Sequence, residues 1–402
     1  MKICFVNNLF PPVAQGGTEV VVQTTIDLLR QRGHNVILIT TSPTRTREQW
    51  SIETSLGFSI YRFRPKNLYY YTEGYTQPVW KKLLWHAFDI INPLAASTLE
   101  HIIRQENPDL VHGHNLKGMS YTLPRVCAKL GIPYVHTLHN YQLLHPYGTF
   151  LYNQPPPYFS PRIAAWLYQA INKRQFRPTR LVVSPSNYVL AMHVRAGFFT
   201  ASEKQILPSG IKLPTEGHMH RMDDLPLRLV YVGALEHIKG IRQLIASVKR
   251  LPEQTVSLDI YGTGSLQLEV AREITGRKNI QMRGYLKDKN RLRSYNVLVF
   301  PSICYETQGL VVLEALSYGL SVIASNIGGP TEVIEPGVNG LLVPAGNVEA
   351  LTQGILKLAN DRKTLRDLQS QTRKSVEKYS LADYASRLLA IYHSVVGGVA
   401  AG

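Results

Sequence analysis

Short runs of apolar residues alternate with stretches of helical periodicity from one end of the chain to the other. In the first half the runs that predict strands are Ile3–Asn7, Val36–Thr40, Ser59–Phe63, Leu110–His114, Tyr134–Leu138 and Leu181–Ser184. Between them lie helical stretches such as Thr18–Arg32 and Pro161–Arg174. This alternation is typical of a parallel sheet that helices cover on both faces.

A second series of strands begins near Arg228 and predicts Leu229–Val232, Leu258–Tyr261, Ile280–Arg283, Val297–Pro301, Val322–Ala324 and Gly340–Val343. A polar, Pro-bounded stretch without periodicity separates the two series and predicts a linker. We therefore predict an α/β protein with two Rossmann-like halves, which would bind ligands between them, outside the carboxyl ends of both sheets. The predicted parts are a first domain of residues 1–210, a linker of 211–226, a second domain of 227–378 and a final helix within 379–402.

Composition supports two soluble domains. A chain of 402 residues is long for one core, and 44% hydrophobic residues exclude a disordered or fibrous protein. The three cysteines, odd in number and far apart, predict neither disulfides nor a metal site, so we expect no metal and a cytoplasmic location. No apolar run approaches the roughly 18 residues that span a bilayer, so the chain is expected to be soluble or peripherally attached to a membrane.

The net charge of +16 indicates an anionic partner, such as a phosphate-bearing substrate, an acidic membrane surface or nucleic acid. Residues 1–205 hold 21 Lys and Arg and 10 Asp and Glu, a net of +11, which leaves +5 for the rest. Within this half, the segment Arg62–His86 interleaves Lys and Arg with Tyr and Trp. A membrane interface selects such a mixture. A Tyr-rich loop that caps the core, followed by an ordinary helix from about Pro78, is an equal alternative. Nucleic acid is disfavoured because no nucleic-acid module surrounds the segment.

Three features of the first half are candidates for a binding site. Gly16 and Gly17 precede a helix, where free N–H groups and the helix dipole favour an anion, although a flexible turn would look the same. His114 and His139 follow predicted strands, at the edge where parallel sheets bind ligands. For His112 and His136, earlier in the same strands, we expect a structural role.

The second half carries a lysine, a glycine turn and two glutamates at strand ends. Lys239 lies in a strand-to-helix loop, where it can contact a diphosphate. The turn at Gly262 lacks the third glycine of a dinucleotide fingerprint, which argues against an NAD site. Glu306 precedes a predicted helix and Glu314 lies inside it. We expect Glu314 to be buried, where a carboxylate needs hydrogen-bond partners such as sugar hydroxyls.

In this order, the motifs resemble glycosyltransferase family 4, the retaining sugar transferases of GT-B fold. They are the Gly16-Gly17 loop, Asp109-Leu-Val-His112-Gly-His114, His136-Thr-Leu-His139-Asn-Tyr141, Leu207-Pro-Ser-Gly210-Ile, Tyr231-Val-Gly233 with Lys239-Gly240, Tyr261-Gly-Thr-Gly264, Glu306-x7-Glu314 and Ser325-Asn-Ile-Gly-Gly329-Pro-Thr-Glu332. The resemblance covers nearly the whole chain. It implies two Rossmann-like domains that face each other across a cleft, with a C-terminal helix that crosses back to the first.

The resemblance also implies a division of labour, with a nucleotide sugar on the second domain and the acceptor on the first. Glu306 would contact the transferred sugar, Glu314 the ribose, and Lys239 with Gly309 and Leu310 the diphosphate. The rest of the donor site would comprise Gly233, Gly262 and the backbone near Arg283. Among the remaining residues, His114 and His139 would lie near the reacting centre, while Gly16, Gly17 and Lys117 would contact phosphate or acceptor. No cofactor beyond the donor substrate is implied.

Three positions depart from the family pattern: Ala234 replaces an Arg, Gln308 an aromatic residue and Ser209 an Asn. The resulting hypothesis is a metal-independent, retaining hexosyltransferase that uses a glycan or lipid-linked glycan acceptor in cell-surface polysaccharide or glycolipid synthesis. A sugar-nucleotide epimerase of similar shape and a non-catalytic basic protein that binds membrane or nucleic acid are the alternatives.

Overall fold

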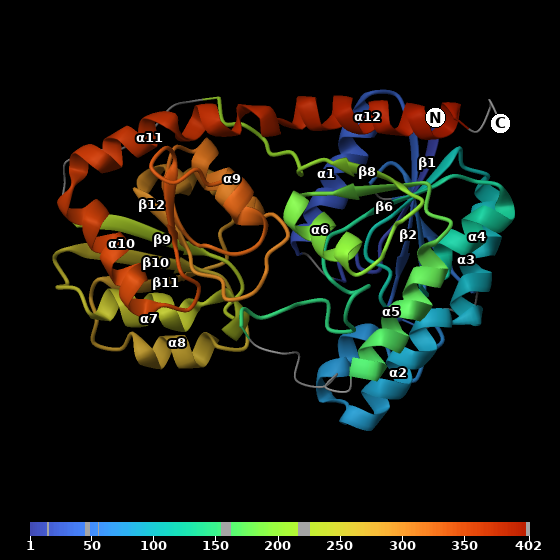
Figure 1. Cartoon of the computed structure of the whole chain (residues 1–402), viewed down its shortest axis with the longest axis horizontal. Helices are drawn as coiled ribbons and strands as arrows, with labels where there is room; N and C mark the ends of the chain where they lie inside the picture. The colour runs from blue at the N-terminus through green and yellow to red at the C-terminus, as the bar shows by residue number, and fades with distance from the viewer. Residues whose placement is uncertain (14–15, 45–48, 55, 154–161, 216–225, 399–402) are drawn as a thin grey trace. The chain divides into compact units, whose positions relative to one another are not determined.

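The computed structural model describes residues 1–13, 16–44, 49–54, 56–153, 162–215 and 226–398. Contacts divide the chain into two units. The first comprises Met1–Thr149, Pro157–Pro208 and Tyr384–Gly402, and the second comprises Phe150–Pro156 and Ser209–Asp383. Each unit is built on its own sheet (Figure 1).

In its described part, the first unit has an eight-stranded sheet in the order β3-β4-β2-β1-β5-β6-β7-β8. Its strands are β1 (Lys2–Val6), β2 (Asn35–Thr41), β3 (Ser51–Glu53), β4 (Ser59–Phe63), β5 (Leu110–Gly113), β6 (Tyr134–Thr137), β7 (Leu181–Ser184) and β8 (Glu203–Ile206). Neighbouring strands are parallel except β3 and β4. The helices are α1 (Gly17–Gln31), α2 (Val79–Ile91), α3 (Pro93–Glu106), α4 (Leu123–Leu130), α5 (Arg162–Phe176) and α6 (Asn187–Arg195).

The predicted strands of this unit are confirmed, and two more border them. The central strands are buried on both faces, which is why they read as apolar runs. At the sheet edges, β3 is three residues long and β8 (Glu-Lys-Gln-Ile) is polar and partly exposed. These two edge strands lack a continuous apolar run, so the sequence pattern did not reveal them.

The final helix, α12 (Leu381–Gly397), completes the core of the first unit. Tyr384, Leu388, Tyr392 and Val395 pack with residues of β1, β2 and α1. The Tyr384 hydroxyl lies 3.1 Å from Thr25 Oγ1. The predicted return of the C-terminal helix to the first domain is therefore confirmed.

The described part of the second unit has a six-stranded, all-parallel sheet in the order β11-β10-β9-β12-β13-β14. The strands are β9 (Leu227–Val232), β10 (Val256–Tyr261), β11 (Ile280–Gly284), β12 (Val297–Phe300), β13 (Ser321–Ser325) and β14 (Gly340–Val343). The helices are α7 (Ile241–Lys249), α8 (Gln267–Glu273), α9 (Leu310–Ser317), α10 (Val348–Asn360) and α11 (Arg362–Val376). Successive residues of β9 pack into two different cores, one on each face of the sheet. Leu229 and Tyr231 belong to the first core, and Val230 belongs to the second. Helices therefore cover both faces.

The two units differ from the predicted parts at residues 150–153, 209–211 and 379–383, all of which belong to the second unit. Ile211, assigned to the linker, is buried in the core of the second unit, where its N–H donates to Tyr379 O at 2.8 Å. The described residues 150–153 also belong to the second unit: the Tyr305 N–H donates to Phe150 O at 3.0 Å. Both are long-range pairings that periodicity does not report. Most of the predicted linker lies outside the described residues.

Candidate active site

Histidines gather where β5 and β6, neighbours in the first sheet, end. His114 follows β5 and His139 lies two residues after β6, and their Nδ1 and Nε2 atoms are 2.7 Å apart. The Phe5 ring from β1 stacks on His114 with 5.4 Å between centroids. Parallel pairing brings these strand ends together, so the two predicted histidines share one site within the first unit.

These histidines are held in the neutral form. Burial, with the neighbouring His112 and His139, lowers the pKa of His114 well below its usual range, and burial lowers that of His139 to about 4. The His114 Nε2 atom is buried and finds no hydrogen-bond partner within the described residues. The pair can therefore accept or donate one further hydrogen bond at neutral pH, but it supplies no positive charge.

His112 is held by side chains from two elements. Its Nδ1 lies 2.6 Å from the Tyr392 hydroxyl of α12 and its Nε2 lies 2.7 Å from Thr137 Oγ1. His136 lies 2.8 Å from the Tyr134 hydroxyl through Nδ1. Both histidines are thus bonded to hydroxyl groups. The partner Tyr392 lies 280 residues from His112 along the chain, and no local signal links the two.

Lys117 lies close to a buried carboxyl group that sequence reasoning missed. Burial lowers the pKa of Lys117 to about 8, and Asp89 of α2 partly opposes this effect. Burial raises the pKa of Asp89 to about 7, although the Gly118 N–H donates to its Oδ2 at 2.8 Å. The Lys117 ammonium lies 5.2 Å from the Tyr71 ring centroid. At neutral pH such a lysine can carry a charge and interact with a bound anion.

Gly16 and Gly17 lie at the N-terminus of α1. The helix begins at Gly17, and the Gly16 N–H donates to Glu19 Oε2 at 2.8 Å. The Glu19 carboxylate therefore already accepts a hydrogen bond from one of the N–H groups that we expected to bind an anion. The preceding residues, 14–15, lie outside the described part.

In the second unit, Lys239 and Glu306 meet across 67 residues of sequence. The Lys239 ammonium lies 2.6 Å from Glu306 Oε1, which also accepts a hydrogen bond from Ser302 Oγ at 2.8 Å. Burial opposes the charge of Lys239, but Glu306 outweighs it and the pKa of Lys239 is raised. Gly240 makes the approach possible: it has φ +71°, and a Cβ there would lie 1.9 Å from Pro301 O.

A glycine turn holds the backbone of Glu306 from the other side. Gly328 has φ +70°, and a Cβ on it would meet Glu306 O at 2.6 Å. A Cβ on Gly329 would meet Thr307 O at 2.0 Å, and the Gly329 N–H donates to Glu306 O at 2.8 Å. Thus Glu306 is fixed between two glycine contacts, just before Gly309 (φ +80°) and the start of α9 at Leu310.

Glu314 is paired with a residue that the sequence did not indicate. Its carboxylate forms an ion pair with Lys289, from the 3-10 helix Lys289–Ser294. Its side chain is 20% exposed, so the residue is partly buried. Lys289 therefore satisfies the carboxylate without a ligand.

The remaining predicted donor residues lie on loops after β9 and β10 and on the edge strand β11. A Cβ on Gly262 would lie 1.9 Å from Gly233 O, so these glycines pack one loop on the other. Arg283 on β11 is bound to Asp259 Oδ2 at 3.0 Å, and Asp259 also accepts from the Tyr295 hydroxyl at 2.6 Å. Within the described residues, no group of three or more His, Cys, Asp and Glu side chains could hold a metal ion.

Two departures from the family pattern contact each other. The Ser209 N–H donates to Gln308 Oε1 at 2.9 Å, and Gln308 Nε2 donates to Ser209 O at 3.3 Å. Both residues are buried. Gln308 therefore binds the backbone at the start of the second unit.

Replacing Gln308 with Leu should lower the free energy of unfolding by about 1–3 kcal/mol, because the Ser209 N–H would be left buried and unpaired. Urea denaturation would measure the loss. The same change at exposed Gln353, which contacts Glu349 on α10, should cost less than about 0.5 kcal/mol. Equal effects at both sites would contradict this role for Gln308.

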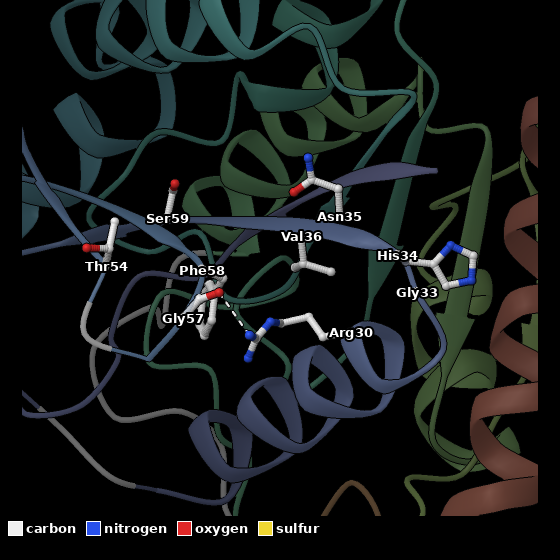
Figure 2. Close-up of a pocket in the computed structure, with 9 residues that line it drawn as sticks. All are labelled: Arg30, Gly33, His34, Asn35, Val36, Thr54, Gly57, Phe58 and Ser59. Atoms are coloured by element: carbon white, nitrogen blue, oxygen red, sulfur yellow. Dashed lines mark hydrogen bonds between the residues drawn. The ribbon is translucent and has the colours of Figure 1, made fainter.

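A cavity of about 640 Å³ lies at the other edge of the first sheet (Figure 2). It is lined by residues at the amino ends of β2 and β4 and at the end of α1: Arg30, Gly33, His34, Asn35, Val36, Thr54, Gly57, Phe58 and Ser59. The histidines lie at the carboxyl ends. This cavity is therefore separate from the candidate site.

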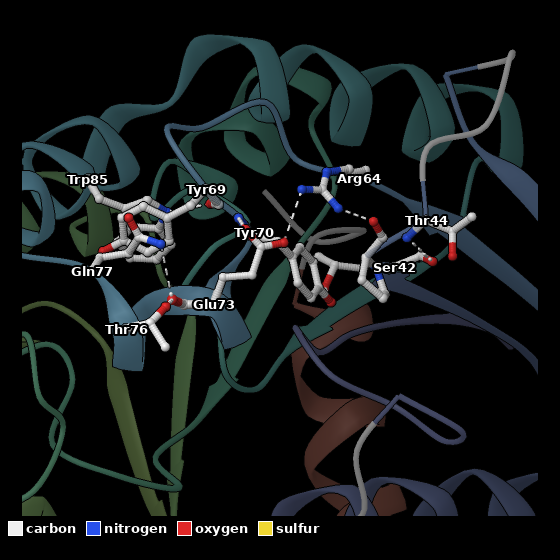
Figure 3. A network of polar contacts seen from close by, with 11 residues as sticks. Ser42, Thr44, Arg64, Tyr69, Tyr70, Glu73, Thr76, Gln77 and Trp85 are labelled. Atoms are coloured by element: carbon white, nitrogen blue, oxygen red, sulfur yellow. Dashed lines mark hydrogen bonds and ion pairs between the residues drawn. The ribbon is translucent and has the colours of Figure 1, made fainter.

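The segment Arg62–His86 is anchored by internal contacts (Figure 3). Tyr69, Tyr70 and Trp85 are buried, and Trp85 Nε1 donates to Tyr69 O at 2.8 Å. Arg64 pairs with Glu73 at 3.3 Å. Tyr69, Tyr70 and Trp85 therefore form a structural cap, as in the loop-and-helix alternative, whereas Trp80 is 63% exposed.

The domains match two family models. Residues 15–213 match "Glycosyltransferase Family 4" and residues 226–361 match "Glycosyl transferases group 1". A relative, an uncharacterised 42.6 kDa protein in the cps region of Klebsiella pneumoniae, is 28% identical over 335 residues, which are 83% of this chain and 87% of that protein.

Two solved structures share the fold. Sucrose-phosphate synthase from Thermosynechococcus elongatus has a TM-score of 0.77 at 20% identity and covers 99% of both chains. The HepE protein of Anabaena, solved in complex with UDP, has a TM-score of 0.72 at 18% identity and covers 98% of this chain and 100% of that one. With both family models matched in order, the chain belongs to glycosyltransferase family 4 and has the GT-B fold.

Proposed function

We propose that the protein is a retaining hexosyltransferase that uses a nucleotide diphosphate sugar as donor. The observation that carries this proposal is the Lys239–Glu306 pair, at the carboxyl edge of the second sheet beside the N-terminus of α9. A cation and a helix N-terminus suit a diphosphate, and a fixed carboxylate suits sugar hydroxyls. The HepE complex, in which a protein of this fold binds UDP, supports the nucleotide.

On the donor side, Lys239 and the backbone N–H groups of Gly309 and Leu310 would bind the diphosphate. Glu314 would exchange Lys289 for the ribose hydroxyls. Gly233, Gly262 and the backbone near Arg283 would border the base. These roles follow the family pattern, and the close-packed glycine loops support them by holding the backbone rigid.

On the acceptor side, the roles fall to the first unit. The neutral His114–His139 pair would accept or donate a hydrogen bond at a sugar hydroxyl. Lys117, Gly16 and Gly17 would contact the acceptor or a phosphate. The net charge of +11 on residues 1–205 supports an anionic or membrane-bound acceptor, a glycan or lipid-linked glycan. Synthesis of a cell-surface polysaccharide or glycolipid on the cytoplasmic side of a membrane fits such an acceptor.

The chemical step would proceed with retention through front-face displacement. The bond from the anomeric carbon to the diphosphate oxygen breaks first, and that oxygen takes the proton of the acceptor hydroxyl as the new glycosidic bond forms. Lys239 and the α9 N-terminus would stabilise the charge that develops on the diphosphate, so the mechanism requires no metal ion.

Donor binding tests the proposal directly. A screen of UDP-, GDP-, ADP- and TDP-sugars should find one that raises Tm, because a ligand at about 100 Kd stabilises the folded state by about 2.7 kcal/mol. Lys239→Met should abolish the shift, whereas Lys249→Met, an exposed lysine on α7, should keep it. Product analysis must then yield a glycoside. Conversion of the donor to an epimer would contradict the transferase mechanism.

A further inference from the structure

The outward face of α2 is apolar. Its exposed side chains recur along one side of the helix and continue to the first turn of α3: Val79, Trp80, Leu83, Leu84, Ala87, Phe88, Ile91 and Leu94. Large apolar side chains that are contiguous on a surface mark an interaction site, whereas single exposed ones are ordinary.

The contacts on the opposite side of α2 fix this orientation. Trp85 is buried and bonded to Tyr69 O, and Asp89 is buried against the Gly118 N–H. The helix therefore carries its acid inward and its apolar residues outward. Rotation of the apolar face toward the core would break both contacts, so the exposure is built into the fold.

Helix α5 extends the apolar surface. Trp166, at 64%, and Leu167 and Ile171 are exposed. Both helices pack on residues 141–148: the Tyr168 hydroxyl donates to Gln142 O at 2.5 Å, and the His86 ring lies 6.5 Å from that of Tyr147. They lie at the same end of the first unit (Figure 1). We call these exposed residues of α2 and α5 the apolar face.

The charged side chains beside the apolar face are basic and indicate an anionic partner. Lys81 and Lys82 flank it on α2 and Arg174 is exposed on α5, whereas the one acid of the two helices, Asp89, is buried. A surface that is both anionic and apolar at shallow depth complements this arrangement, as the headgroup region of a membrane does. A second copy would oppose two basic faces, which repel.

We propose that the apolar face inserts into an anionic bilayer, with α2 and α5 lying in the interface. This inference rests on the proposed function. Within that function, insertion into the bilayer would mean that the acceptor is lipid-linked. Trp80 and Trp166 would occupy the headgroup level, and the lysines would contact lipid phosphates. Among the described residues no helix is long and apolar enough to cross a membrane.

Vesicle co-sedimentation of the full chain tests the proposal. The protein should bind vesicles of phosphatidylcholine with about a third phosphatidylglycerol. The double change Trp80→Ser and Leu84→Ser should weaken binding at least about tenfold, because two inserted side chains are lost. Leu268→Ser, an exposed apolar residue of the second unit, should leave binding unchanged. Lys81→Gln with Lys82→Gln should reduce the dependence on anionic lipid.

Quenching by brominated lipid provides a second readout. Of the four tryptophans, Trp80 and Trp166 should be quenched and buried Trp85 should not. Absence of binding at low salt, or binding that Trp80→Ser with Leu84→Ser does not alter, would overturn the proposal. A dimer in light scattering that the same change dissociates would assign the face to self-association. Because neither assay needs a sugar nucleotide, and soluble-acceptor transfer can be assayed separately, failure here is distinct from failure of the transferase proposal.

Discussion

Glu306→Gln should lower sugar transfer by about a hundredfold to a thousandfold, the usual cost of losing one group that stabilises the transition state. The amide keeps the shape of the carboxylate and can still accept the hydrogen bond from Ser302. It cannot neutralise Lys239 or bind sugar hydroxyls as a charged acceptor. The measurement is kcat with the best donor, and Tm should stay within a few degrees of the parent.

Glu349→Gln provides the matched control, because this carboxylate is exposed on α10 and pairs with Arg250. It should keep near-normal kcat. Lys239→Met should lose activity as well, and the double variant should lose less than the two single effects combined, because the groups act as one unit. Near-normal transfer by Glu306→Gln would remove Glu306 from the site.

Gly240→Ala should destabilise the second unit by at least about 3 kcal/mol, the sum of a left-handed backbone and a clash that the backbone must relieve. The Cβ would lie 1.9 Å from Pro301 O, a backbone atom that cannot rotate away. Urea denaturation followed by circular dichroism would measure the loss, and activity should fall with it because Lys239 would be displaced from Glu306.

Gly276→Ala separates the two causes. Gly276 has φ +84°, similar to Gly240, but no atom lies within 4 Å of a Cβ built there. It should cost only about 1 kcal/mol, the backbone term alone. A similar loss at both glycines would mean that backbone conformation, and not the contact with Pro301, accounts for the effect.

Local pattern was sufficient to predict the two parallel sheets, because their central strands are buried on both faces and read as apolar runs. It also located the strand ends that carry His114, His139 and Glu306. The partners of these residues were not predictable. Lys289 reaches Glu314 across 25 residues, and Asp89 reaches Gly118 from a different element. Such pairs depend on tertiary packing, which leaves no periodic trace in one sequence.

The same limit applies to the departures from the family pattern. Read singly, Gln308 and Ser209 are only departures from the family pattern. In the fold the Gln308 side chain bonds the backbone of Ser209, so the second unit keeps a satisfied buried amide. The direction of the α2 apolar face was also beyond local reasoning, because an apolar stripe on a helix ordinarily faces the core.

Because α12 belongs to the first unit, the core of that unit cannot be completed until the end of the chain has been synthesised. The first unit is translated early, but the side chains of Tyr384, Leu388, Tyr392 and Val395 that close its core are made only after the entire second unit. At about 5–20 residues per second, the ribosome would leave that core open for roughly ten to thirty seconds. During this interval the His112 side chain lacks Tyr392, and the core residues that pack against α12 are uncovered. Until the last helix emerges, the nascent first unit therefore exposes apolar side chains that the finished fold buries.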